Sequence, residues 1–167
     1  MMNLKTYEEQ IPSAARFIME RLQASGYEAY LVGGAVRDLI LGRHPGDYDI
    51  TTNALPEETE AVFRDFGTLE IGKSHGTIGV IVDHRAYEVT TYRVDGEYTD
   101  HRRPDAVTFT RSLEQDLQRR DFRINAVAMD LEGTFGACRG TKRISLGGRF
   151  VPWAIRCNAS KRMPCGF

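Results

Sequence analysis

Acidic residues are missing from the last part of this chain. No Asp or Glu follows Glu132, while seven Lys and Arg residues do. The net charge of −1 therefore hides two unlike parts, since residues 1–132 carry 15 basic and 23 acidic side chains, or −8. The only tryptophan and all three cysteines also lie in the acid-free stretch: Trp153, Cys138, Cys157 and Cys165. This change in composition predicts a domain over residues 1–133 and different material over 134–167.

Other absences exclude whole classes of protein. The three cysteines have neither disulfide-framework nor zinc-ligand spacing. No run of about 18 apolar residues occurs, and the first ten residues lack a signal-peptide pattern, so we expect a cytoplasmic protein without a membrane span. The chain has no G-x-G-x-x-G motif, which argues against a dinucleotide-binding domain. It shows no Ser–His–Asp or Cys–His set, which argues against covalent catalysis.

The patterns that are present predict a mixed α/β (α+β) domain. Apolar spacing and capping residues predict helices over 12–24, 35–42, 55–67 and 112–130, the last in two pieces. Apolar or alternating runs predict strands over 27–34, 47–52, 76–82 and 86–93, the last two joined as a hairpin. Residues 94–110 are polar and contain glycine and proline, so they predict a loop. We therefore expect a small mixed sheet of roughly four or five strands flanked by helices.

Two aspartates and an upstream glycine turn form the pattern that indicates chemistry. Asp47 and Asp49 flank Tyr48 on a predicted strand, where residues two apart point to the same face. The two carboxylates repel each other unless a cation lies between them, and Mg²⁺ favours one or two carboxylates together with substrate phosphates. Gly33 and Gly34 lie between a predicted strand and a helix, where backbone N–H groups can approach an anion. Together they predict a metal–triphosphate site.

Each part of this pattern also has an ordinary explanation. A Gly-Gly pair after a strand is most often just a turn, and a lone D-x-D is usually a solvated strand end. Arg37, one turn into the helix, could add a guanidinium to the phosphates or simply pair with Asp38 on the surface. The order and spacing of the parts favour the site over the separate explanations.

The same residues resemble a known family. The segments "LVGGAVRDLILGR" and "DYDITT", followed by "GTIGVIVDHRAYEVTTYR", "DGEYTDHRRPDAVTF" and "LEQDLQRRDFRINAVAMD", are similar in order to the motifs of the head domain of class II tRNA nucleotidyltransferases and bacterial poly(A) polymerases. This family belongs to the polymerase-β-like nucleotidyltransferase superfamily. The resemblance covers roughly residues 12–131 and implies that fold.

The resemblance also implies roles for individual residues. Asp47 and Asp49 would bind the catalytic Mg²⁺ ions, and Glu88 is a further candidate carboxylate whose alternative is a cross-strand pair with an arginine. The residues that would hold the nucleotide fall into three groups: Gly33, Gly34 and Arg37 at the phosphates, Arg120 and Asp121 at the ribose, and Asn125 supporting the sugar or phosphate.

The implied activity is addition of nucleotides to an RNA 3′ end without a template. A 3′-hydroxyl would attack the α-phosphate of ATP or CTP with release of pyrophosphate, as in CCA addition to tRNA. The head motifs leave open a poly(A) polymerase or an A- or CC-adding enzyme, and from another class, a non-catalytic nucleotide-binding fragment.

The tail departs from the family pattern. The base-reading segment that the family pattern places after the head is missing, but the codons of the tail permit that segment in a shifted reading frame. Each shifted codon joins the third base of one codon to the first two of the next, so Trp153–Ala154 must give Gly and Met163–Pro164 must give Ala. Together with the neighbouring steps, whose codons leave a choice, the shifted frame can read "V-G-D-P-M-Q-R-F-E-E-D-A-L-R". We therefore expect a frame change near residues 133–143, and a chain with little or no selective CCA addition.

Overall fold

The computed structural model describes residues 9–95, 107–120, 126–133, 135–137, 143–146 and 149–152. Its α-helices are α2 (Ser13–Ala24), α3 (Gly34–Ile40), α4 (Pro56–Val62) and α5 (Leu113–Gln118), with a 3₁₀ turn η1 (Lys73–His75). Its strands are β1 (Ala29–Val32), β2 (Asp49–Thr52), β3 (Gly67–Gly72), β4 (Thr77–Val82), β5 (Arg85–Thr91), β6 (Arg93–Asp95), β7 (Val107–Phe109), β8 (Val127–Met129), β9 (Phe135–Ala137), β10 (Arg143–Leu146) and β11 (Arg149–Pro152). No helix in these ranges is long and apolar enough to cross a membrane.

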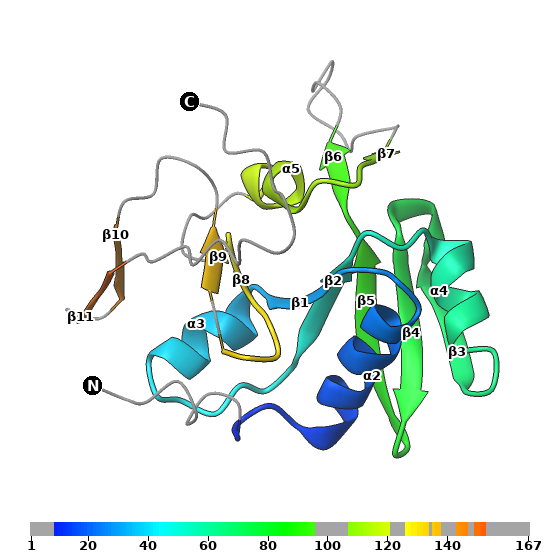
Figure 1. Cartoon of the computed structure of the whole chain (residues 1–167), viewed down its shortest axis with the longest axis horizontal. Helices are drawn as coiled ribbons and strands as arrows, with labels where there is room; N and C mark the ends of the chain where they lie inside the picture. The colour runs from blue at the N-terminus through cyan, green and yellow to red at the C-terminus, as the bar shows by residue number, and fades with distance from the viewer. Residues whose placement is uncertain are drawn as a thin grey trace.

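The main sheet of the described structure has seven strands in the order β3-β4-β5-β2-β1-β8-β9 (Figure 1). Only the β2–β5 pair is parallel, and the other pairs are antiparallel. The predicted mixed sheet is therefore confirmed, but the expected count of four or five strands was too low. Outside this sheet, β6 pairs with β7 and β10 pairs with β11.

Three strands of the main sheet were missed, namely β3, β8 and β9. β9 lies within residues 134–167, which were predicted to be different material. β3 is an edge strand whose residues are mostly exposed, so no buried face marks it. Residues 126–130 were predicted as helix, but Val127–Met129 is a strand with all three side chains buried. A fully buried strand reads as a continuous apolar run, which periodicity cannot distinguish from a helix. The predicted loop over 94–110 was also wrong at its ends, which pair as β6 and β7.

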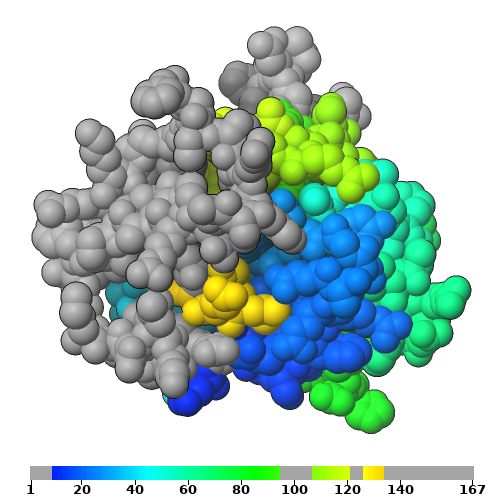
Figure 2. Space-filling view, viewed as in Figure 1, coloured from blue at the N-terminus to red at the C-terminus, as the bar shows by residue number. Residues whose placement is uncertain are grey.

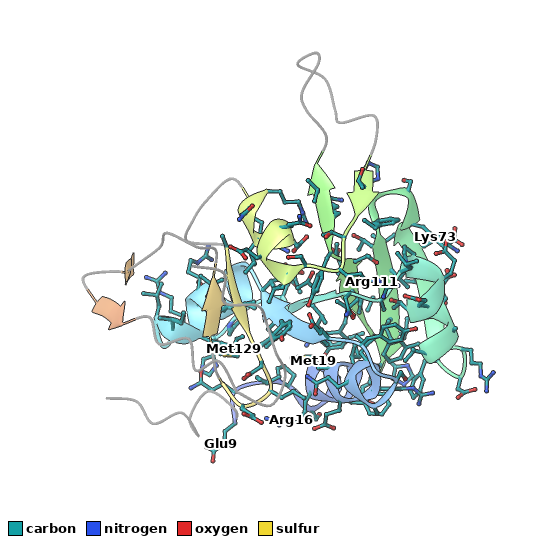
Figure 3. All side chains as sticks on the ribbon, turned by 45° about the horizontal axis from the view of Figure 1, so that its top comes forward. Glu9, Arg16, Met19, Lys73, Arg111 and Met129 are labelled. Carbon is teal, nitrogen blue, oxygen red and sulfur yellow. The ribbon has the colours of Figure 1, made fainter. Side chains whose placement is uncertain are left out.

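Helices α2, α3 and α4 contribute to one apolar core against the sheet. Figure 2 shows α2 in dark blue and α4 in teal next to each other on one face, and Arg21 of α2 donates from Nε to the carbonyl of Val62 at 2.9 Å. Met19 of α2 and Met129 of β8, labelled in Figure 3, belong to this core and are fully buried. Burying a side chain of this size contributes about 1.5–3 kcal/mol.

The opposite face of the sheet is partly covered by α5. Leu31 of β1 belongs to the main core, while the next residue, Val32, packs in a second cluster with Leu117 of α5 and Ala128 of β8. The serine that begins α5 was predicted as a cap, and Ser112 Oγ does accept a hydrogen bond from the Gln115 backbone N–H at 3.4 Å. This face carries the polar residues of the candidate site.

The β4–β5 hairpin offers a test of the fold. Its turn residues Asp83 and His84 both have positive φ, 50° and 62°, a conformation that favours Asn-Gly. Replacing the pair by Asn-Gly should raise the free energy of unfolding by about 0.5–1 kcal/mol in urea titrations. Glycine in place of Arg85, which is within strand β5, should instead lower it. An unchanged or lowered urea midpoint for the Asn-Gly variant would contradict this turn geometry.

Candidate active site

The pairing of β1 with β2 brings the glycine turn beside Asp49. Val32, the last residue of β1, lies opposite Asp49, the first residue of β2. Gly33 follows with φ +71° and ψ −138°, a backbone conformation that side chains other than glycine rarely adopt. A Cβ built on Gly33 would lie 3.8 Å from Asp49 Oδ2. The turn is thus open toward the carboxylate.

Arg120 approaches the same point from α5. Its Nη1 lies 3.9 Å from the position of a Cβ on Gly33. Its charge acts to lower the pKa of the Asp49 carboxyl. The residue immediately follows the C-cap of α5, Arg119. The structure therefore brings together three sequence-predicted residues, Gly33, Asp49 and Arg120, from a turn, a strand and a helix end.

Asp49 has an unfavourable environment for a negative charge. Its pKa is raised, first because surrounding protein displaces water and then because Asp47 adds like charge, with Arg120 opposing both effects. The residue nevertheless keeps an exposed surface at the beginning of β2. A carboxylate that is partly desolvated and open on one side is suited to accept a cation from solvent.

Asp47 and Asp49 line one pocket of about 200 Å³, but only Asp49 is in a strand. The pocket walls are formed by residues 46–49 and 85–88. The prediction of one strand over 47–52 was wrong at its start, since β2 begins at Asp49. Asp47 precedes the strand and is exposed. The two carboxylates face the same pocket all the same.

Glu88 lines that pocket as well. The parallel register pairs Ile50 with Val89, which places Glu88 beside Asp49 on the adjacent strand. Even so, no group of three His, Cys, Asp or Glu side chains close enough to hold a metal ion occurs in the described ranges. The aspartate pair is therefore the better candidate, and Glu88 as a third ligand stays a prediction.

Arg37 lies one turn into α3, with its guanidinium beside the glycine turn. Its Nη2 is 3.5 Å from the position of a Cβ on Gly34, so the guanidinium covers that backbone. Arg37 Nε also donates to Asp38 Oδ1 at 2.8 Å, and this hydrogen bond lowers the pKa of the Asp38 carboxyl. Arg37 thus pairs with Asp38 on the surface and also lies close to the glycine turn. Two other predicted residues, Asp121 and Asn125, lie outside the described residues.

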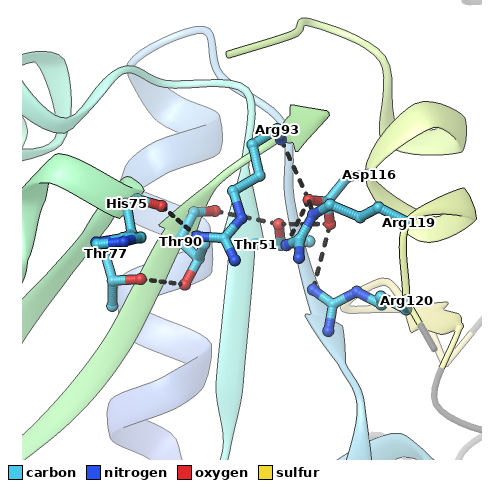
Figure 4. Close-up of polar contacts among 8 residues, drawn as sticks. All are labelled: Thr51, His75, Thr77, Thr90, Arg93, Asp116, Arg119 and Arg120. Carbon is cyan, nitrogen blue, oxygen red and sulfur yellow. Dashed lines mark hydrogen bonds and ion pairs between the residues drawn. The ribbon is translucent and has the colours of Figure 1, made fainter. Parts of the chain in front are cut away.

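Asp116 is a polar residue that the sequence analysis missed. It is completely buried on α5, and it accepts hydrogen bonds from Arg119 Nε at 2.9 Å and Arg120 Nη2 at 3.2 Å (Figure 4). The signal was present in its spacing, because Asp116 lies three residues after Leu113 and directly before Leu117, on the apolar side of the helix. A carboxylate at such a position requires partners.

Comparisons with known proteins agree with this geometry. Residues 29–145 match the family model of the poly A polymerase head domain. The CCA-adding enzyme of Geobacillus thermodenitrificans is 60% identical over 117 residues, which are 70% of this chain and 28% of that protein. A crystal structure of the Bacillus stearothermophilus CCA-adding enzyme in complex with CTP is 51% identical with a TM-score of 0.66, over 74% of this chain and 29% of that one.

A tRNA nucleotidyltransferase complexed with a primer tRNA and an incoming ATP analog is 31% identical with a TM-score of 0.53, over 74% of this chain and 34% of that one. The site and the matches define a nucleotidyltransferase fold. This chain belongs to the poly A polymerase head domain family. It spans less than a third of the length of the curated relatives it matches, and residues 146–167 lie outside the family match.

The raised pKa of Asp49 predicts a pH-dependent effect on stability. The pKa of Asp49 in the folded state lies above the ordinary 3.8. Ionisation of this carboxyl at neutral pH is therefore less favourable in the folded state than in the unfolded state, which lowers the free energy of unfolding. Asp49→Asn should raise Tm at pH 7 by on the order of one or two degrees, since water screens this exposed group. The difference in Tm between Asp49→Asn and the wild-type chain should disappear as the pH falls through the folded-state pKa of Asp49, because the wild-type carboxyl then becomes neutral. Thermal melts at several pH values measure this, and a Tm lowered by the substitution at pH 7 would contradict it.

Proposed function

We propose that this chain is the catalytic head of a template-independent RNA 3′-nucleotidyltransferase that adds CCA to tRNA. In this reaction CMP or AMP is transferred from CTP or ATP to a 3′-hydroxyl, and pyrophosphate is released. The observation that carries the proposal is the convergence of Gly33, Asp49 and Arg120 in a chain that is 60% identical to a CCA-adding enzyme over 117 residues. The relatives' names favour CCA addition over poly(A) synthesis.

Asp47 and Asp49 would hold Mg²⁺. The fit rests on the shared pocket and on the raised pKa of Asp49, to which the charge of Asp47 contributes. Enzymes that transfer nucleotides generally use divalent cations, and all-oxygen carboxylate ligands suit Mg²⁺. When bound, the ions supply charge stabilisation at the attacking and departing oxygens.

The chain's own residues would position the triphosphate. The open backbone at Gly33 and Gly34 lets phosphate oxygens approach N–H groups closely. Arg37 beside this turn and Arg120 across from it supply positive charge on two sides. By resemblance, Arg120 and Asp121 contact the ribose, and Asn125 supports it. The protein contributes orientation and electrostatics rather than a covalent nucleophile.

Selection of the base and binding of tRNA would depend on parts beyond this head. The chain spans 28% of the length of its first relative. For the whole protein we propose ATP, CTP and a tRNA 3′ end as partners, and the cytoplasm as its location. The acid-free tail is proposed to result from a frame change near residues 133–143. The head alone would then bind nucleotides without distinguishing their bases.

Isothermal titration of CTP and ATP with Mg²⁺ tests the proposal. We expect metal-dependent binding of both nucleotides with similar affinity, because the proposed site residues would contact the phosphates and the sugar and none of them is assigned to the base. The Asp47→Ala, Asp49→Ala double variant should lose this binding while remaining folded by circular dichroism. Binding that is equal without metal or in the double variant would contradict the assigned carboxylates. Absence of any binding to the folded chain would contradict the proposed function for it.

Gly33 and Gly42 form a matched pair for testing the turn. Both have nearly the same φ, +71° and +70°, but a Cβ on Gly42 would meet nothing within 4 Å. Alanine at either position should cost about 1–3 kcal/mol of stability from backbone strain. Only Gly33→Ala should weaken Mg²⁺–CTP binding, by about tenfold or more, since its methyl enters the space between Asp49 and Arg120. Equal affinity of the two variants would show that the turn does not contact the nucleotide.

A further inference from the structure

Asp116 is the only charged side chain that is completely buried in the part of the chain that the structure describes. Its two oxygens are contacted by donor groups of four residues. Oδ1 accepts from Arg119 Nε at 2.9 Å and from the Arg93 backbone N–H at 3.2 Å. Oδ2 accepts from Arg120 Nη2 at 3.2 Å and lies 3.4 Å from Thr51 Oγ1 (Figure 4). A buried carboxylate needs this many partners, because removing its charge from water is costly.

These contacts connect the site's elements. Thr51 is two residues beyond Asp49 on β2, so their side chains leave the same face of the strand. Thr51 has one hydroxyl proton, which can be donated either to Asp116 Oδ2 or to the Thr90 carbonyl of β5, whose oxygen lies 3.1 Å from Oγ1. Asp116 thus fixes the end of α5 to the strand that begins with Asp49 and, through Arg93, to β6.

Arg120 is held at only one end of its guanidinium. Nη2 is bonded to Asp116, while Nη1 extends toward Gly33 and Asp49. Nε is buried and has no hydrogen-bond partner among the described residues. The side chain as a whole is 19% exposed. A free arginine would have many rotamers, so an anchor at Nη2 defines where the remaining donors lie.

We propose that Asp116 is a positioning residue that holds the Arg120 guanidinium in the orientation that meets the nucleotide. The inference rests on the proposed nucleotide site and adds a residue that touches neither substrate nor metal. Asp116 binds Nη2 of Arg120 and leaves Nη1 directed toward the Gly33 turn, so it fixes the geometry of this guanidinium.

A first experiment tests the anchor without any nucleotide. In ¹H–¹⁵N spectra of the ligand-free chain, the Nε–H signal of Arg120, assigned by its loss in Arg120→Lys, should be resolved and slow to exchange because Nε is buried. In Asp116→Asn, which preserves shape but removes the charge, this signal should collapse to the position of a mobile arginine. In Asp65→Asn, which removes an exposed partner of Arg21 far from α5 in the sequence, it should stay. An unchanged Arg120 signal in Asp116→Asn would overturn the proposal.

A second experiment asks whether Asp116 acts on the nucleotide through Arg120. Asp116→Asn and Arg120→Ala should each weaken Mg²⁺–CTP binding about tenfold, and the double variant should be no weaker than either, since both remove the same oriented guanidinium. A merely structural role of Asp116 would instead give multiplied losses of about a hundredfold, which would overturn the proposal.

Arg120→Lys keeps the proposal testable if Asp116→Asn does not fold. Lysine retains the charge but cannot bond Asp116 and present a second, fixed donor at once. We expect it to bind Mg²⁺–CTP about tenfold more weakly, and wild-type affinity would overturn the proposal. If the wild-type chain binds no nucleotide, the proposed function fails, while the Arg120 spectrum still decides whether Asp116 holds that side chain.

Discussion

The antiparallel pairing of β1 with β2 is the contact on which the candidate site depends. Because Val32 lies opposite Asp49, the last residue of β1 and the first residue of β2 lie side by side at one end of these two strands. The glycine turn and the acidic residue are therefore neighbours, although 16 positions separate Gly33 from Asp49. A shift of one residue in this register would send Asp49 to the core face. Burial of Leu31 and Ile50 on that face opposes such a shift.

The face of the sheet that carries the candidate site brings charges of both signs together. Asp47, Asp49 and Glu88 line one pocket, and Arg120 approaches from α5. The pKa of the Asp49 carboxyl is raised above its ordinary value, first by burial. Such arrangements are typical of functional sites, where stability is exchanged for binding. The buried Asp116 forms ion pairs with both Arg119 and Arg120, and the second of these extends toward the Gly33 turn.

Much of this arrangement could be predicted from the sequence because its signals are local. The glycines after a strand, the D-x-D and the apolar spacing of α2 depend on neighbouring residues, and the structure has a turn, a strand start and a helix there. Edge strand β3 and buried strand β8 could not be recognised, since β3 has no buried residue and β8 buries all three of its side chains. The partners of Asp116 were beyond reach for another reason. They come from β2, β6 and α5, and only tertiary structure defines which donors meet a buried carboxylate.

The central claim is that a metal–triphosphate binds at the point where β1 ends and β2 begins. A crystal structure of this chain grown with CTP and Mn²⁺, which substitutes for Mg²⁺ and scatters anomalously, tests it most directly. The account predicts an anomalous peak at coordination distance, about 2.1 Å, from carboxylate oxygens of Asp47 and Asp49, with phosphates against Gly33 and Gly34. A metal peak away from these carboxylates, or a triphosphate bound elsewhere on the domain, would contradict it.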